Sequence, residues 1–434
     1  MLSYAVMTVV DTLFVGRLGP SALAGVGLGG TAAFALACFS FGLLRGTKVL
    51  ISQARGAGNN EELGSHLGAG LATALVLGVV TLAAAFVTAE LLPSLAATAE
   101  AGANAQAYFK SRMITVPALF VYVALRESRY GLGDARSPMV ASVLGNVVNI
   151  GLDYVLIFGF DLGVGGAGAA TATAHALEAA VLIVVQARMG FDIARTRWSH
   201  VRALWRMGLP SGIQFMLEMG SFAVLATLLS RLSEFDMAGH LIALQVVHFS
   251  FLPAVALAEA ASVLTGEAIG ARRDEMVVRV SRLTMILAAV YTGACGIVMA
   301  VGGRWIAGAF TEDPGLIALA TKLLVIAAIF QVFDAANIVS RGVLRGVGDV
   351  RFAAVAGITL AWISVPPLTW FLGYHLGLGA VGGWLALLTE IILGAFVLVW
   401  RVERGGWHST VARLRAQREA VQPAEPEAAV PAVA

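Results

Sequence analysis

The stretch GLGDAR at residues 131–136 returns as GVGDVR at residues 346–351, 215 residues further along the chain. Three other pairs of segments recur at an offset of 214 residues: QARGAGNN (53–60) with EAIGARRD (267–274), LGVGGAG (162–168) with LGLGAVG (376–382), and more weakly VGRLG (15–19) with LSRLS (229–233). An internal repeat of this length indicates two similar halves. In a membrane protein, such halves usually form a transporter whose substrate path lies between them.

The composition indicates that most of the chain lies in a membrane. Of its 434 residues, 58% are hydrophobic and 13% are charged, whereas a soluble domain carries about 25% charged residues. Apolar runs at 67–89, 283–303 and 352–373 are each long enough to cross a bilayer, which takes roughly 20 residues of helix. The two cysteines, Cys38 and Cys295, lie in apolar runs, so we expect small buried side chains and no disulfide.

The apolar runs predict an all-α polytopic membrane protein with twelve transmembrane helices in two six-helix bundles. The predicted spans are 1–15, 21–44, 66–92, 107–130, 138–160, 165–187, 208–232, 238–264, 281–303, 315–341, 352–373 and 378–400. The predicted units are an N-terminal bundle (1–187), a cytoplasmic linker (188–207), a C-terminal bundle (208–401) and a cytoplasmic, largely disordered tail (402–434). The first span is short for a full crossing, so we expect this helix to be truncated at its N-terminus.

The distribution of basic residues predicts the orientation in the membrane. Alternate connections and the tail hold 23 of the 29 Lys and Arg residues. The opposite side holds the other six, which are Arg17, Lys110, Arg112, Arg231, Arg304 and Lys322. Because cytoplasmic loops carry the excess of basic residues, we expect a multi-pass protein of the plasma (inner) membrane whose GxGD loops, linker and C-terminus are cytoplasmic.

Four carboxylates, Asp11, Asp153, Glu218 and Asp334, fall within predicted membrane spans. Ionisable groups at membrane depth are costly and mark a functional site by default. Helical spacing places two further sets of polar residues on shared faces with Asp153 and Asp334: Asn146 and Asn149, and Gln331, Asn337 and Arg341. These patterns predict a site for a proton or a hard cation such as sodium. The alternative is that the polar groups only hold helices together through hydrogen bonds.

The two GxGD segments are predicted to be structural turns. Alternate glycines allow a tight turn, and Asp134 or Asp349 can cap the next helix or pair with a nearby arginine. Those arginines are Arg129, Arg136, Arg345 and Arg351.

Features of soluble enzymes are absent from the sequence. We recognise no P-loop, no Ser-His-Asp set and no Cys/His metal spacing, so we expect neither an enzyme nor a protein that uses ATP. The basic residues lie along loops without interleaved aromatic residues, so nucleic acid is not an expected partner. The expected partners are a small-molecule substrate and membrane lipids.

Five segments along nearly the whole chain resemble the multidrug and toxin extrusion (MATE) family. They are VDTLFVGRLG (10–19), NVVNIGLDYVLIFGF (146–160), LGVGGAGAATATA (162–174), LPSGIQFMLEMGSFA (209–223) and FDAANIVSRGVLRGVGD (333–349). The resemblance implies two six-helix bundles that form a V-shaped antiporter. It also implies the export of cationic or amphipathic compounds in exchange for protons or sodium, by alternating access and with no cofactor besides the coupling ion.

The resemblance also implies two sets of ion-coupling residues. In the N-terminal bundle the matching residues are Asp11, Tyr108, Asn149, Asp153 and Thr171. In the C-terminal bundle, Glu218 and Asp334 match residues that the sodium-linked branch of the family uses. Sodium could therefore bind at Glu218 and Asp334 or at Asp11 and Asp153, and the sequence leaves both the coupling ion and the operative bundle open.

The substrate remains unspecified by the sequence. Plausible walls of a polyspecific cavity are Phe215, Met216, Met219, Phe222, Phe251 and Gln245, although such stripes are more often helix packing. One alternative function is a flippase for lipid-linked precursors, which would need arginines in its cavity to bind pyrophosphate, whereas this chain has acids at depth. Another is a membrane receptor or scaffold that transports nothing.

Overall fold

A computed structural model describes residues 10–190 and 193–421, and this part of the chain is nearly all helical with no strand. Its α-helices are α2 (Pro20–Gly56), α3 (Asn60–Leu95), α4 (Ala99–Met113), α5 (Val116–Gly131), α6 (Arg136–Tyr154), α7 (Gly163–Ala187), α8 (Trp198–Leu232), α9 (Glu234–Gly270), α10 (Glu275–Gly308), α11 (Pro314–Gly346), α12 (Val350–Thr369), α13 (Ala380–Glu403) and α14 (His408–Val421). Three short segments complete it: π-helical η1 (Val155–Gly159) and η3 (Trp370–His375), and the 3₁₀ turn η2 (Ile193–Arg195). A short helix at residues 10–16 precedes α2.

The expected all-α membrane architecture is confirmed. Among the described residues, ten helices are long and apolar enough to cross a membrane, and there are eleven such spans if α4 and α5, bent by 52°, are counted together as one. The bend falls just before Pro117, because proline suits the first turn of a helix and interrupts a longer one. The helix at 10–16 accounts for the predicted first span, whose residues 1–9, and with them its predicted truncation, lie outside the described part.

The internal repeat is visible in the backbone. Helix α6 ends in the π-helical segment η1, and α12 ends in the π-helical segment η3. The repeated segments LGVGGAG and LGLGAVG follow these π-helical ends and lead into α7 and α13. Since π-helical turns are rare, their recurrence at matching positions supports the prediction of two similar halves.

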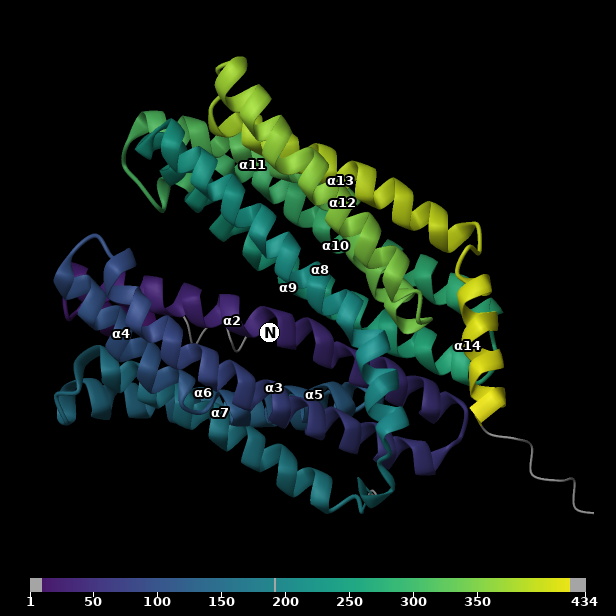
Figure 1. Ribbon diagram of the computed structural model, residues 1–434. Helices are drawn as coiled ribbons and strands as arrows, with labels where there is room; N and C mark the ends of the chain where they lie inside the picture. The colour runs from purple at the N-terminus through teal and green to yellow at the C-terminus, as the bar shows by residue number, and fades with distance from the viewer. Residues whose placement is uncertain (1–9, 191–192, 422–434) are drawn as a thin grey trace, which may run out of the picture.

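The helices form two groups that lie face to face (Figure 1). The helix at 10–16 and α2–α7 form the N-terminal bundle, and α8–α13 form the C-terminal bundle. The bundles meet at one end, where the C-terminal half of α2 packs on α8 and α9, and they diverge towards the other. A Cβ atom at Gly42 of α2 would lie 2.6 Å from the carbonyl oxygen of Ser211 on α8, so this close helix contact requires glycine.

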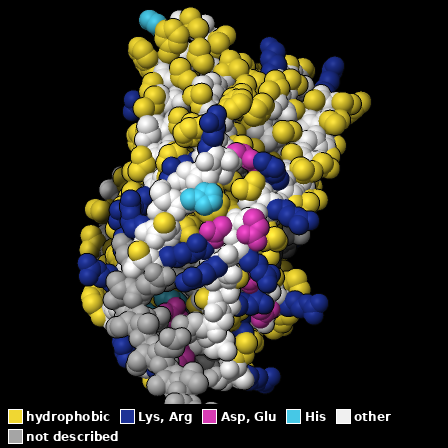
Figure 2. All heavy atoms as spheres, turned by 90° about the vertical axis from the view of Figure 1, so that its right-hand side faces the viewer, with side chains coloured by type: hydrophobic (Ala, Val, Ile, Leu, Met, Phe, Trp, Pro, Cys, Tyr) yellow, Lys and Arg dark blue, Asp and Glu magenta, His cyan; other side chains and the backbone are white. Residues whose placement is uncertain are grey.

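The end where the bundles meet carries many basic side chains. Figure 2 looks onto this end and shows Lys and Arg side chains gathered there among few acidic ones. The apolar side chains lie further up the molecule in the same view. The separation of basic and apolar surface agrees with the alternation of charge read from the sequence.

The second half of the predicted linker is helical in the structure. Helix α8 begins at Trp198, ten residues before the predicted span at 208. Leu204 is fully buried against Val49 and Leu50 of α2. This apolar contact extends α8 beyond the membrane run, and single-sequence hydropathy does not detect it.

The tail is also more ordered than predicted. Residues 408–421 form α14, whereas residues 422–434 lie outside the described part. Trp407 and Val411 are buried against the C-terminal bundle, and Arg415 pairs with Asp274 at 2.6 Å. Apolar anchors one helical turn apart, together with an ion pair, hold this part of the tail in place.

Candidate functional site

The N-terminal bundle buries two carboxylates beside each other. Asp11 on the helix at 10–16 is 6% exposed, and Asp153 near the end of α6 is fully buried. The two side chains are close enough to interact directly. Asp153 Oδ1 has no hydrogen-bond partner in the described structure. Two neighbouring buried carboxylates repel each other unless a positive charge lies between them, so this pair is suited to bind a proton or a cation.

Two further predicted residues complete this site. Thr171 on α7 donates from Oγ1 to Asp11 Oδ2 over 3.4 Å. The Asn149 amide, with its nitrogen towards Asp11, donates to Asp11 Oδ1 over 3.0 Å and accepts from the Thr171 backbone N–H over 3.3 Å. The structure therefore brings Asp11, Asn149, Asp153 and Thr171 together from three helices. No group of three His, Cys, Asp or Glu side chains suited to a metal occurs among the described residues, so a cation here would need amide and hydroxyl oxygens as well.

Tyr108, the fifth predicted residue, is linked to a cation that the sequence reading did not include. Tyr108 on α4 is buried, and its hydroxyl accepts from Arg112 Nη1 over 2.5 Å. Arg112 in turn attracts Asp11 electrostatically. From the sequence alone, Arg112 counts only as one of the six basic residues on the side opposite the cytoplasm. Its i+4 spacing from Tyr108 is the one signal that could have placed it here.

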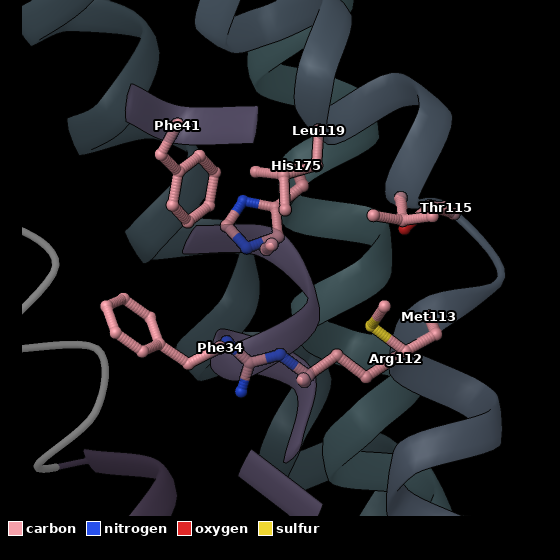
Figure 3. A pocket seen from close by; sticks show the side chains of 10 residues that line it. Phe34, Phe41, Arg112, Met113, Thr115, Leu119 and His175 are labelled. Carbon is pink, nitrogen blue, oxygen red and sulfur yellow. The ribbon is translucent and has the colours of Figure 1, made fainter. Parts of the chain in front are cut away.

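A small cavity of about 40 Å³ adjoins this site. Figure 3 shows Arg112 extending towards Phe34, and His175 lying beside Phe41. His175 Nδ1 lies 3.0 Å from Glu178 Oε2 on the same helix, α7. The lining thus combines aromatic rings with two basic side chains, and each of these has a carboxylate nearby. The full lining is Ala33, Phe34, Ala37, Phe41, Arg112, Met113, Thr115, Val116, Leu119 and His175.

The six residues predicted as substrate-cavity walls lie outside this lining. Phe215 on α8 is the nearest to it, because its ring packs edge-on against Phe34 at 6.0 Å between centroids. Met216, Phe222 and Phe251 are exposed on the C-terminal bundle. Gln245 is exposed and Met219 is half-buried. Their role in substrate binding stays a prediction.

In the C-terminal bundle, an arginine lies between the predicted carboxylates. Arg341 Nη1 on α11 lies 2.5 Å from Glu218 Oε1 on α8, and Arg341 Nη2 lies 3.5 Å from Glu390 on α13. Arg341 also donates to Asn337 over 2.6 Å and attracts Asp334. Glu218 and Asp334 are therefore parts of one cluster, but a built-in cation already compensates Glu218. The sequence reading placed Arg341 on the face of Asp334 and missed Glu390, which lies in the last apolar run.

The two GxGD turns behave differently. Asp134 Oδ1 accepts from the backbone N–H groups of Arg136 and Ser137, both over 3.0 Å, so it caps α6 as predicted. Asp349 instead accepts from Arg401 Nε on α13 over 2.9 Å and from Thr410 on α14 over 3.2 Å. Asp349 therefore anchors the tail, although the sequence predicted a local cap or a pair with a nearby arginine.

Comparison with known proteins agrees with the fold and the motifs. The MatE family model matches residues 1–155 and 210–371. Proteins named "Probable multidrug resistance protein NorM" are similar: that of Pseudomonas syringae pv. tomato is 30% identical over 422 residues, covering 93% of this chain and 91% of that protein. That of Bradyrhizobium diazoefficiens is 29% identical and covers 92% of this chain and 90% of its own length.

Solved structures show the same fold. A structure titled "Crystal structure of MATE in the bent conformation" aligns with a TM-score of 0.88 at 21% identity, covering 94% of this chain and 93% of the other. One titled "Outward-facing conformation of a multidrug resistance MATE family transporter of the MOP superfamily" aligns with a TM-score of 0.87 at 21% identity, covering 95% and 93%. Together with the family match over most of the sequence, these findings show that the chain belongs to the MatE family of membrane transporters.

Proposed function

We propose that this protein is a secondary active antiporter that exports cationic or amphipathic drugs in exchange for protons or sodium. The names of its relatives support multidrug export. The observation that carries the coupling is the buried pair Asp11 and Asp153, in which Asp153 Oδ1 has no hydrogen-bond partner. One charge that moves through a membrane potential of 100 mV releases about 2.3 kcal/mol, so binding at this pair can drive a change between two states.

The N-terminal bundle is the better candidate for the operative ion site. Asp11 receives hydrogen bonds from the neutral side chains of Thr171 and Asn149, and the described residues contain no ion pair to Asp11 or Asp153. In the C-terminal bundle, the cation of Arg341 already lies on Glu218. An ion from solution should therefore bind more favourably in the N-terminal bundle than in the C-terminal bundle, because the carboxylates there are not already compensated by a salt bridge.

In the proposed cycle, the basic end of the molecule lies in the cytoplasm. The state described has the bundles in contact at that end and diverging at the other, so it corresponds to the outward-facing state. Binding of the ion at Asp11 and Asp153 would shift the helix at 10–16 and favour the opposite state.

The flippase alternative is not favoured. The relatives that match almost the whole chain are multidrug resistance proteins. The paired carboxylates also suit a cation and not the pyrophosphate of a lipid-linked precursor, because like charges repel.

The test is efflux of an ethidium-like dye from proteoliposomes under imposed proton and sodium gradients. We expect Asp153→Asn and Asp11→Asn to abolish ion-driven efflux. Asp161→Asn is the matched control, because this exposed loop carboxylate has a positive φ that Asn tolerates. Unchanged efflux in both site variants would exclude the N-terminal site, and loss only in Glu218→Gln or Asp334→Asn would assign coupling to the C-terminal bundle.

A further inference from the structure

A buried ion pair joins the two bundles at their basic end. Lys48 on α2 of the N-terminal bundle pairs with Glu259 on α9 of the C-terminal bundle. Lys48 is 1% exposed, and the Glu259 side chain is 14% exposed. Both charges are therefore shielded from water at the place where the bundles touch.

Each partner of this pair has a second, oppositely charged neighbour within its own bundle. Lys48 Nζ lies 3.5 Å from Glu127 Oε2 on α5. Glu259 Oε1 lies 3.7 Å from Arg345 Nη2 on α11. The two oxygens that face these neighbours, Glu127 Oε2 and Glu259 Oε1, have no hydrogen-bond partner among the described residues. Glu127 Oε2 can therefore accept a closer contact from Lys48, and Glu259 Oε1 can accept one from Arg345.

The second neighbours, Glu127 and Arg345, lower the free-energy cost of separating Lys48 from Glu259. Pulling apart a buried ion pair leaves two unpaired charges in a low-dielectric interior, which is strongly unfavourable. Here, Lys48 can move onto Glu127 and Glu259 onto Arg345, so neither charge is left alone when the bundles part. A pair built only for rigidity would not need a second partner on each side.

We propose that Lys48 and Glu259 form a reversible ionic latch that holds the two bundles together at the basic end. When the bundles separate there, Glu127 takes over Lys48 and Arg345 takes over Glu259. The latch rests on the proposed transport cycle, in which this end must open. It adds a set of residues that neither the ion site nor the substrate cavity contains.

Another ion pair between the bundles provides a natural comparison. Arg55 Nη1 on α2 lies 2.7 Å from Glu267 Oε1 on α9, about two helical turns beyond the latch. The Arg55 side chain is 46% exposed, so water replaces this pair readily when it breaks. Loss of this exposed pair should have little effect on the opening of the interface.

Opening can be followed from a single buried position at the same contact. Ser52 on α2 is fully buried and faces Gly266 of α9, so a thiol there reacts only when the bundles part. The parent protein is the full chain with Cys38→Ser, Cys295→Ser and Ser52→Cys. The measurement is the rate of maleimide alkylation in detergent, without drug and without an ion gradient, on protein that elutes as a single species.

We expect Lys48→Gln and Glu259→Gln each to accelerate alkylation by at least about tenfold, equivalent to ~1.4 kcal/mol. The double variant should be no faster than the faster single variant, because either change already removes the pair. Arg55→Gln should react at the parent rate. A Lys48→Gln rate equal to that of Arg55→Gln, or additive effects in the double variant, would overturn the latch.

The second partner has its own test. Glu127→Gln leaves Lys48 with Glu259 alone, so we expect alkylation no faster than in the parent and slower dye efflux. Arg126, which also pairs with Glu127, is 30% exposed and can turn to water. Faster alkylation in Glu127→Gln would refute the transfer. The two proposals can fail separately. If dye efflux by the parent protein does not depend on an ion gradient but the latch variants show the expected alkylation rates, the proposed antiport is wrong and the proposed latch is still supported.

Discussion

The guanidinium of Arg341 on α11 lies 2.5 Å from the carboxylate of Glu218 on α8. Gln214 also donates to the same oxygen, Glu218 Oε1, over 3.0 Å. A tethered cation thus lies where the sequence suggested that sodium could bind. Three carboxylates, Glu218, Glu390 and Asp334, share this one arginine.

Removal of that arginine should expose the cluster to external cations. In Arg341→Gln the three carboxylates lose their counter-charge, so we expect a loss of stability of about 3 kcal/mol in choline chloride, in the range for breaking a buried pair. Sodium chloride should raise the melting temperature of the variant by more than it raises that of the unmodified protein.

The control for this change is Arg282→Gln. Arg282 pairs with Glu403 at 2.5 Å, but its side chain is 64% exposed, so its loss should leave the melting temperature nearly unchanged. Equal melting curves for Arg341→Gln in the two salts would show that the cluster does not bind sodium even without its arginine.

The cap of α6 gives a prediction with a defined dependence on pH. Asp134 lies in the loop before α6. Burial alone would raise its pKa, but hydrogen bonds from the Ser137 hydroxyl and from the backbone N–H groups of Ser137 and Arg136 hold the pKa below its usual range. We expect Asp134→Ala to cost about 1 kcal/mol at neutral pH, as for other lost caps.

The sign of the pH effect follows from the lowered pKa. A carboxylate whose pKa is lower in the folded state stabilises the protein above its unfolded pKa of about 3.9, and the contribution is lost as the pH falls through the folded pKa. The difference between the unmodified protein and Asp134→Ala should therefore shrink below about pH 4. Asp134→Asn keeps an acceptor without a charge, so its stability relative to Asp134→Ala should not change over this range. Unfolding in denaturant at several pH values measures both.

Much of the fold could be predicted from the sequence, because apolar length and the internal repeat are local properties. The extension of α2 from the predicted 44 to Gly56 could not. It carries Lys48 past the apolar run, to a buried position where this lysine pairs with Glu259 on α9 of the other bundle. A hydropathy pattern cannot identify a partner more than 200 residues away.

The candidate site was predictable to a different extent in each bundle. Helical spacing placed Asn149 and Asp153 on one face of α6, and family resemblance added Asp11 and Thr171, which the structure brings into contact. In the other bundle the sequence grouped Arg341 with Asp334 on α11. It could not show that Arg341 reaches Glu218 on α8, because that depends on how the helices of the bundle are arranged in space.

The glycine contact between α2 and α8 should set how closely the bundles approach. A Cβ atom at Gly42 would meet the carbonyl oxygen of Ser211 at 2.6 Å and the Cα of Gly212 at 2.7 Å. Backbone atoms cannot move aside as a flexible side chain can, so Gly42→Ala must displace α8. We expect the interface to open, with faster alkylation of the Ser52→Cys thiol and a lower melting temperature.

The matched control lies in the same helix. A Cβ atom at Gly27 of α2 would meet nothing within 4 Å. Gly27→Ala should therefore leave the alkylation rate unchanged and stabilise the helix slightly, because alanine exceeds glycine in helix propensity by about 1 kcal/mol. If Gly42→Ala behaved like Gly27→Ala, the bundles would not be held at this distance by backbone contact, and the charges at Lys48 and Glu259 would have to hold them alone.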